Sequence, residues 1–487
     1  MKKYFFDVTD IVTYLENSAT ISGIQRVTTM IINNVVDHLG DGDIYLSYYD
    51  EKAGDYVATP LTNLSPTTQV DMPFIAKVFL PDIPKAPKGI YPLQKYQPNS
   101  PKYHFHRLKL SFHAALNDEK YFVKRGFTLK EWQTWRLEDG KQQQAEQIHS
   151  EDVKLRKLTD IFQSGDVLCI LGPLWGTPKK DVKLAEYSKR GLDIFVLVHD
   201  VVPLLLPATV AIDPVVFFTG LETSTGYCRG YIANSECTAS DLRNFLDALG
   251  CATEISTIPL AQDRITAREV TAKNPSPEQG KQSAAEVFEF VKTVRRLRHD
   301  IRTIIKLPYV LCVGTMEARK NCWRIAQAWQ QLAARQDINL PRLVFAGRRG
   351  WLNDDFFDAM DKTGGLGGWV QFVDAPSDSE LEYLYQNCEF TIMASLYEGW
   401  GLPIGESLSY GKTGVVSNTS SMPEVGGDLV EYCDPHSISS IASACETLIV
   451  EPKRRQALED RIAKATLRQW SDVSRELAEV ISGKSLS

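Results

Sequence analysis

The sequence lacks several features that mark large classes of protein. Its nine cysteines form no Cys-x-x-Cys pair, so we expect a reducing compartment and neither a disulfide framework nor a structural zinc site. No run of about 18 apolar residues occurs, so we expect no transmembrane helix. Asp7 and Asp10 interrupt the first apolar run, so we expect no signal peptide. A P-loop and a zinc-type histidine cluster are also missing.

Charge and composition narrow the class further. The formal net charge of −7 and the pI near 5.7 argue against a protein whose whole surface binds nucleic acid. Hydrophobic residues make up 43% and charged residues 24%, as in an ordinary soluble globular protein. The 487 residues are enough for two or three domains.

Apolar strand-like runs alternate with helical patterns in both halves of the chain. The predicted strands span residues 4–8, 44–49, 166–171, 194–198, 231–233, 255–258, 309–313, 343–346, 370–373, 390–393 and 415–416, with helices such as 323–334 and 379–387 between them. Continuous apolar strands separated by helices indicate parallel sheets covered on both faces. The sequence therefore predicts an α/β protein with two doubly wound domains.

Two segments interrupt this alternation. Residues 95–136 carry nine Lys or Arg against three Asp or Glu, interleaved with aromatic residues and three histidines. They predict an insertion at about 90–160, which is either a surface for an anionic acceptor or membrane, or a helical elaboration packed on its own domain. Residues 274–283 predict a loop, and 286–306 predict a basic amphipathic helix. Such a helix can lie on anionic lipid but more often packs on its own domain. The main domain boundary is expected in this region.

The most informative stretch is residues 395–406, SLYEGWGLPIGE, which follows an apolar strand and opens a helical pattern. Seven residues, several of them glycines, separate two carboxylates, Glu398 and Glu406. Glycines let the backbone approach a ligand closely and expose N–H groups at a helix start, as needed to hold a phosphorylated sugar. The alternative is a tight turn with two solvated glutamates, but the intervening GWGLP and the downstream SNTSSMPEVGG argue against it.

A second motif is VGTMEARKN at residues 313–321, which follows a strand and precedes a helix. Arg319 and Lys320 therefore lie where ligands bind in such sheets, at the carboxyl end of a strand. Cations at a helix N-terminus oppose the helix dipole, so an anion is expected to offset them.

Together these motifs resemble the family 4 retaining glycosyltransferases of the GT-B fold, and more narrowly the bacterial mannosyl- and rhamnosyltransferases of surface polysaccharide synthesis. The resemblance covers residues 309–475 almost continuously and touches the first half at three places. It implies an acceptor-side Rossmann-like domain at 1–300 and a nucleotide-sugar-binding Rossmann-like domain at 301–465. A C-terminal helix at 466–487 would pack back towards the first domain.

The resemblance also implies roles for residues of the second half. Lys320 would contact the donor diphosphate with Arg319 assisting, and Glu398 would contact donor-sugar hydroxyls. Further donor-binding positions are Gly314, Thr315, Gly347, Phe372, Gly399, Trp400, Gly401, Leu402 and Glu406, the last of these at the ribose. Many family members have arginine where this chain has Thr315, and Arg319 is expected to supply the missing charge. Phe372 and Trp351 either stack near the base or pack in the core.

In the first half, the resemblance places His199, in VLVHDVVP, beside the reacting sugar, which makes it a candidate catalytic residue with Glu398, Lys320 and Arg319. Gly23, in SGIQRV, would cover the donor phosphates. Ser235 and Thr238 either lie near the cleft or cap a helix. The pair at residues 41 and 43 has the spacing of the metal-binding carboxylates of the other large glycosyltransferase fold, but its context predicts a turn.

The activity implied is transfer of a sugar, with retention of configuration, from GDP-mannose or a dTDP- or UDP-sugar to a hydroxyl of a growing glycan or lipid-linked acceptor. Fixed cations and helix dipoles would take the place of a metal, and no cofactor is expected. The expected partners are the donor and the acceptor, with no nucleic acid, and peripheral contact with the inner membrane stays open. The expected location is the cytoplasm.

Two alternatives remain from the sequence. A sugar-nucleotide epimerase or phosphorylase can share the fold, although the segment around Glu398 argues against it. An inactive glycan-binding partner subunit is the other, although degenerate copies usually lose charges such as Lys320 and Arg319. Donor sugar, base, acceptor, linkage and oligomeric state stay open.

Overall fold

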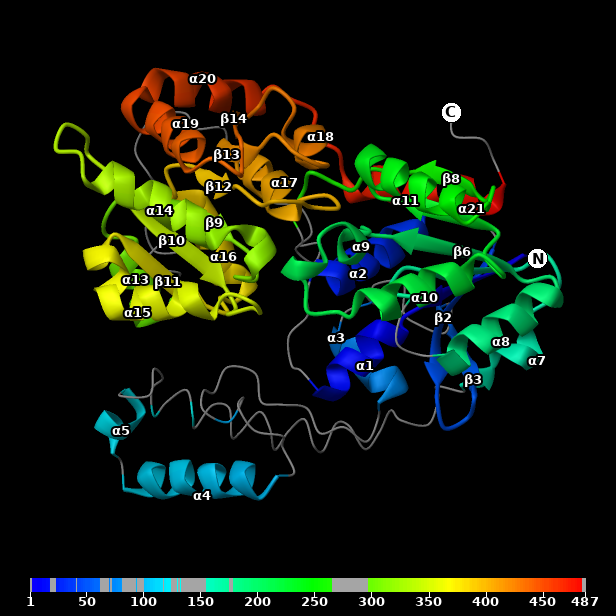
Figure 1. Cartoon of the computed structure of the whole chain (residues 1–487). Coiled ribbons are helices and arrows are strands. Elements are labelled where there is room, and N and C mark those ends of the chain that lie inside the picture. The colour runs from blue at the N-terminus through cyan, green and yellow to red at the C-terminus, as the bar shows by residue number, and fades with distance from the viewer. Residues whose placement is uncertain are drawn as a thin grey trace.

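Two sheets with helices packed around them form the body of the protein (Figure 1). The computed structural model describes residues 2–17, 23–40, 42–61, 70, 72–80, 93, 100–116, 118–123, 129, 132, 155–174, 178–264 and 297–483.

In the ranges that the structure describes, the first sheet has eight strands in the order β4-β3-β2-β1-β5-β6-β7-β8. Their bounds are β1 Lys3–Asp7, β2 Asp43–Asp50, β3 Asp55–Pro60, β4 Arg156–Lys157, β5 Val167–Ile170, β6 Asp193–Val198, β7 Gly230–Ala233 and β8 Glu254–Thr257. The pairs from β2 through β1 to β8 are parallel, whereas β3 and β4 extend one edge as antiparallel strands.

The second sheet has six parallel strands in the order β11-β10-β9-β12-β13-β14. Their bounds are β9 Tyr309–Val313, β10 Arg342–Gly347, β11 Val370–Asp374, β12 Thr391–Met393, β13 Gly414–Ser417 and β14 Glu431–Cys433. The strand order reverses between β9 and β12, and ligands bind at such a switch point in open α/β sheets.

Helices connect the strands of both sheets. Those of the first half are α1 Thr9–Asn17, α2 Gly23–Val35, α3 Met72–Phe79, α7 Leu158–Ile161, α8 Pro178–Lys189, α9 Val202–Leu205, α10 Pro214–Ser224 and α11 Glu236–Ala248. Those of the second half are α13 His299–Ile304, α14 Cys322–Ala333, α15 Asp354–Gly368 (with left-handed backbone at 364–367), α16 Asp378–Asn387, α17 Leu402–Ser409, α18 Met422–Gly426, α19 Ile438–Val450, α20 Pro452–Ile462 and α21 Trp470–Ser482. Two short 3₁₀ helices are η3 Pro207–Thr209 and η4 Ala318–Lys320.

The central strands are apolar along their whole length because helices cover both of their faces. Phe5 and Phe6 are adjacent in β1, yet they enter different hydrophobic clusters on opposite sides of the first sheet. In β9, Val310 and Leu311 divide in the same way between the two faces of the second sheet. This explains why continuous apolar runs, and not alternating ones, mark these strands.

Helix α21 returns from the second half of the chain to the first sheet. Trp470, Leu477 and Ile481 are buried in the cluster that contains the apolar face of α2. Ser474 Oγ also donates a hydrogen bond to Ile31 O of α2 at 3.2 Å. The last helix therefore fastens the two halves together.

Each strand predicted from the apolar runs is present, with bounds within one residue of the prediction. The strands that the sequence did not reveal are β3, β4 and β14, which lie at or beside sheet edges. Residues 274–283 lie outside the described residues, and so does the segment 286–296 of the predicted amphipathic helix. Where that segment is described, Leu297, Ile301 and Ile304 are buried on their own sheet, so this part packs within its domain.

The basic, aromatic segment forms helices α4 Pro101–Ala115 and α5 Glu119–Val123, drawn in cyan in Figure 1 apart from the two sheets. Tyr103 and Leu110 of α4 are buried in a small cluster of their own, with Leu93, Phe122, Leu129 and Trp132. Within the described part of the chain, no helix combines the length and the apolarity needed to cross a bilayer.

Candidate active site

The candidate site forms where the carboxyl ends of β9 and β12 meet. The turn after β9 carries Arg319 and Lys320, and the loop after β12 carries Glu398. Asn321 holds the two segments together, because its Nδ2 donates to Ala394 O at 2.9 Å. Residues far apart in the sequence thus converge at the switch point of the second sheet.

Both carboxylate oxygens of Glu398 form ion pairs. Lys320 Nζ lies 2.7 Å from Oε1, and Arg319 Nη1 lies 2.6 Å from Oε2. The Glu398 N–H donates to Ser420 Oγ at 3.0 Å, and Ser421 Oγ donates to the Glu398 carbonyl at 2.8 Å. The side chain is only 7% exposed, so its position is fixed from all sides.

The two cations keep Glu398 ionised although it is buried. Burial alone would raise the pKa of this carboxyl, but the charges and hydrogen bonds of Arg319 and Lys320 outweigh burial and lower the pKa to about 2. Glu398 therefore carries a negative charge at any physiological pH.

This shifted pKa predicts a pH-dependent stability. The unfolded carboxyl, at its ordinary pKa of 4.5, takes up a proton before the folded one does, so the stabilisation is complete above pH 4.5 and is lost as the pH falls towards 2. Between pH 5 and pH 3 the wild type should lose about 2 kcal/mol from this group, a loss that Glu398→Gln lacks. Urea unfolding of both proteins at each pH measures this. A stability gap between them that stays constant with pH would contradict the assignment.

The guanidinium of Arg319 is bound by carboxylate and carbonyl oxygens of the protein itself. Besides Glu398, its guanidinium donates to Glu317 Oε1 and to Tyr397 O, each at 2.6 Å. Burial opposes the charge on Arg319, but Glu398 and Glu317 raise its pKa well above the ordinary value. Its assistance to a diphosphate stays a prediction. The observed contacts are those of a residue that orients Glu398.

Lys320 lies against Gly314, the glycine that follows β9, and Gly314 in turn lies against Gly347 at the end of β10. Gly314 has a left-handed φ of +135°, and a Cβ there would lie 3.6 Å from Lys320 Cε. A Cβ on Gly347 would lie 2.0 Å from Gly314 O, so only glycine lets these strand ends approach so closely. Three predicted donor-binding positions thus meet in one place. Among the described residues, no group of three or more His, Cys, Asp or Glu side chains is arranged to hold a metal ion.

Glu406 lies in a pocket at the junction of the two domains. Its Oε2 accepts a hydrogen bond from Tyr385 Oη at 2.7 Å, and burial raises the pKa of Glu406. The first half of the chain contributes Arg26, which pairs with Asp378, and Arg264, which stacks over the ring of Tyr410. The second predicted glutamate therefore faces a space that both domains close.

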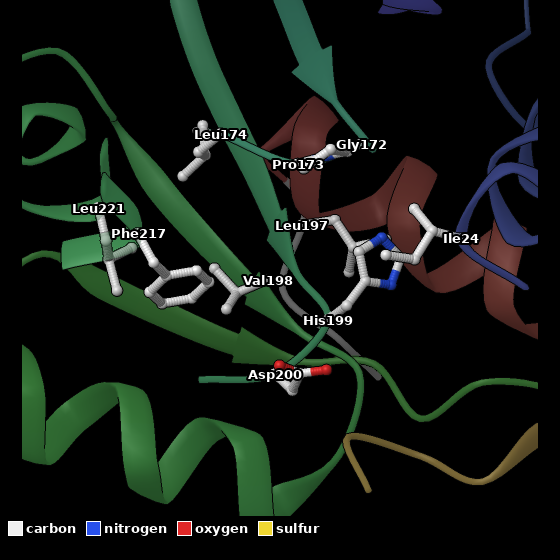
Figure 2. A pocket seen from close by; sticks show the side chains of 10 residues that line it. All are labelled: Ile24, Gly172, Pro173, Leu174, Leu197, Val198, His199, Asp200, Phe217 and Leu221. Atoms are coloured by element: carbon white, nitrogen blue, oxygen red, sulfur yellow. The ribbon is translucent and has the colours of Figure 1, made fainter. Parts of the chain in front are cut away.

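His199 follows the end of β6 and lines a small pocket of about 40 Å³ with Ile24, Asp200 and Phe217 (Figure 2). Its Nε2 lies 2.7 Å from Leu171 O. A carbonyl only accepts, so Nε2 carries the hydrogen and Nδ1 is the acceptor in the neutral ring. Burial lowers the pKa of His199, which favours this neutral form.

Gly399 brings the two predicted motifs into contact across the domain junction. A Cβ on this residue would lie 1.8 Å from His199 O, closer than any real side chain can approach. Thr238 Oγ1 of the first half donates to Gly399 O at 3.3 Å. The loop that carries Glu398 thus touches the strand end that carries His199.

A second junction contact involves helix α11. The Glu424 carboxylate accepts hydrogen bonds from the N–H groups of Glu236 and Cys237, at 2.8 and 2.9 Å. A carboxylate is favoured there because a helix N-terminus carries unpaired N–H groups and a positive dipole end. Ser235 Oγ accepts from Thr238 N–H at 3.0 Å, so the capping alternative for Ser235 is confirmed.

The remaining predicted residues of the second half differ in their surroundings. Phe372 packs against Phe345, with ring centroids 5.7 Å apart, as the core alternative requires. Trp400 is buried, and its indole donates to Ala261 O of the first half at 3.3 Å. Gly401 starts α17 with a left-handed φ of +104°. Thr315 is partly buried beside Gly350.

Gly23 of the first half begins α2 and faces Leu402 of the second. A Cβ on Gly23 would lie 3.5 Å from Leu402 Cδ1, an ordinary contact. Trp351, the other aromatic candidate for the base, is 43% exposed.

Several residues of the site were not predicted. Glu317 lies two residues before Arg319 in the same motif, so the sequence could have indicated that its carboxylate pairs with Arg319. Tyr385 gave no signal, and Glu424 lies in the segment SNTSSMPEVGG but was given no role, because each reaches its partner only through the tertiary fold.

Comparison with known proteins identifies a family domain in the second half of the chain. Residues 295–465 match the family model described as Glycosyl transferases group 1. The O-antigen chain mannosyltransferase B of Escherichia coli is 35% identical over 165 residues, which are 34% of this chain and 43% of that protein. The serotype-specific mannosyltransferase WbdA of Escherichia coli is 24% identical over 167 residues, 34% of this chain and 20% of that protein. The chain thus matches less than half the length of these relatives.

Two solved structures match over nearly their full length. Sucrose-phosphate synthase of Thermosynechococcus elongatus has a TM-score of 0.53 at 12% identity, covering 99% of this chain and 98% of that one. HepE of Anabaena, in complex with UDP, has a TM-score of 0.50 at 11% identity, covering 99% and 100%. At this identity the likeness shows the fold alone. The chain therefore has the two-domain GT-B fold, and residues 295–465 are a group 1 glycosyltransferase domain.

Proposed function

We propose that the protein is a retaining hexosyltransferase that moves mannose, or a related sugar, from a nucleoside-diphosphate donor to a hydroxyl of a growing surface polysaccharide. The observation that carries the proposal is Glu398, held ionised between Arg319 and Lys320 at the switch point of the second sheet. The mannosyltransferase relatives favour mannose as the sugar.

In this proposal the diphosphate lies against Lys320, the Gly314 turn and the start of α17. The bond from the sugar C1 to the diphosphate breaks, and a bond from C1 to the acceptor oxygen forms on the same face. The acceptor proton passes to the leaving diphosphate oxygen. Lys320 stabilises the charge that develops there. The proposed reaction uses no metal and no cofactor.

Glu398 and His199 would hold the sugar in this reaction. An ionised carboxylate only accepts hydrogen bonds, so Glu398 would bind sugar hydroxyls near C1. Nδ1 of the neutral His199 would accept from another hydroxyl, because Nε2 is already bound to Leu171 O. The contact of Gly399 with His199 brings the loop of the one to the strand end of the other.

The finer proposal is a lipid-linked glycan acceptor and a peripheral position on the cytoplasmic face of the inner membrane. Its support is the similarity to enzymes of O-antigen synthesis. The bound nucleotide would reach Glu406, where the ribose hydroxyls would be the hydrogen-bond donors.

A thermal-shift panel of GDP, UDP, dTDP and ADP tests the donor site. One nucleotide should stand out, and a mannosyl donor makes GDP the first expectation. At about 100 times its dissociation constant, the ligand should add roughly 2.7 kcal/mol to stability. If no nucleoside diphosphate raises the melting temperature, the proposed donor site is wrong.

A further inference from the structure

Helix α4 presents an apolar face on each of its two sides. One side, with Tyr103 and Leu110, is buried in the small cluster described above. The other side carries Phe105, Leu108 and Phe112 and is continued by the C-cap residue Leu116; these are 62%, 70%, 61% and 62% exposed. Residues three or four positions apart share one face of a helix, so these four form a continuous stripe. We call Phe105, Leu108, Phe112 and Leu116 the α4 stripe.

Positive charge flanks the α4 stripe. Lys102 and Lys109 are both exposed and lie two turns apart, so they line up along the same edge of the stripe. The helix contains no Asp or Glu at any position. Phe and Leu on one face with lysine beside them is the pattern of a helix that lies in a membrane interface.

The charge pattern decides between two occupants of the stripe. A second copy of α4 would bring its own lysines towards these and would offer no carboxylate to pair with them. Anionic headgroups offer negative charge beside an apolar layer, and so match both parts of the surface. We propose that α4 docks the protein on an anionic lipid bilayer, with Phe105, Leu108 and Phe112 inserted at the boundary between headgroups and acyl chains.

Co-sedimentation of the full chain with lipid vesicles tests this proposal. The wild type should bind vesicles of phosphatidylcholine with phosphatidylglycerol, and binding should weaken with added salt. The combined variant Phe105→Ser, Leu108→Ser and Phe112→Ser should bind at least about tenfold more weakly. The variant Lys102→Glu with Lys109→Glu should also bind these vesicles at least about tenfold more weakly than the wild type. On vesicles of pure phosphatidylcholine, the two proteins should bind equally.

Matched controls are available elsewhere on the surface. Val215→Ser with Val216→Ser removes exposed apolar side chains from α10, and Lys362→Glu with Lys453→Glu makes the same charge change on α15 and α20. Both should bind vesicles like the wild type. The α4 variants should keep the wild-type melting temperature and nucleotide-induced shift, so vesicle binding can fail or succeed independently of the proposed transferase activity.

Three results would overturn the proposal. The first is wild-type binding by both α4 variants, and the second is equal loss of binding by the control variants. The third is a concentration-dependent dimer in solution that the serine variant converts to a monomer, which would make the stripe a contact between copies.

Discussion

Replacing Lys320 with alanine should lower kcat/KM for sugar transfer by at least about a hundredfold, the scale of losing one transition-state contact. Lys320 is the cation beside the Gly314 turn, and its Nζ is 2.7 Å from Glu398. A departing diphosphate gains negative charge as the bond to C1 breaks, so the loss should fall mainly on kcat. Steady-state kinetics with donor and acceptor, together with the melting temperature, give the measurement.

The kinetics must separate two roles for Lys320. If the lysine binds the diphosphate, the variant should also lose the thermal shift induced by the nucleoside diphosphate. If the lysine only holds Glu398 in place, nucleotide affinity should survive while transfer fails. Lys362→Ala, which removes an exposed lysine paired with Asp358, is the charge-matched control and should behave like the wild type. Near-normal turnover by Lys320→Ala would refute the phosphate assignment.

The buried central strands could be predicted from the sequence, whereas an exposed edge strand could not. A buried parallel strand must be apolar on both sides, so continuous apolar runs in the sequence predict β1, β9 and β10. The edge strand β4 has two exposed residues, Arg156 and Lys157, and gives no such signal. Burial therefore determines which strands the sequence reveals.

In the site, the motifs identified the residues but not their pairing. The position of Arg319 and Lys320 at a helix start predicted an anion that offsets the two cations. The structure supplies part of that anion from within the protein, because Glu398 accepts from both. Since Glu398 lies 78 positions beyond Lys320, only the packing of β9 beside β12 brings them together. Tyr385 reaches Glu406 by a similar tertiary contact, so local patterns could not find it.

Gly399→Ala should reduce kcat/KM by about a hundredfold or more without unfolding either domain, since a misplacement of about 1 Å in an active site can cost that much. Gly399 does not have a positive φ, so alanine fits its backbone conformation. The atoms nearest to the added methyl group belong to the other domain: His199 O at 1.8 Å and Asp200 Cβ at 3.0 Å. To relieve this collision, the Glu398 loop and the strand end that carries His199 must move apart. Small-angle scattering should then show a larger radius of gyration, and the melting temperature should change little.

Gly226→Ala is the matched control, because its nearest neighbour, Thr223 O, lies at an ordinary 3.4 Å within the same domain. Wild-type turnover by Gly399→Ala would mean that the contact between this glycine and His199 is not part of the active arrangement.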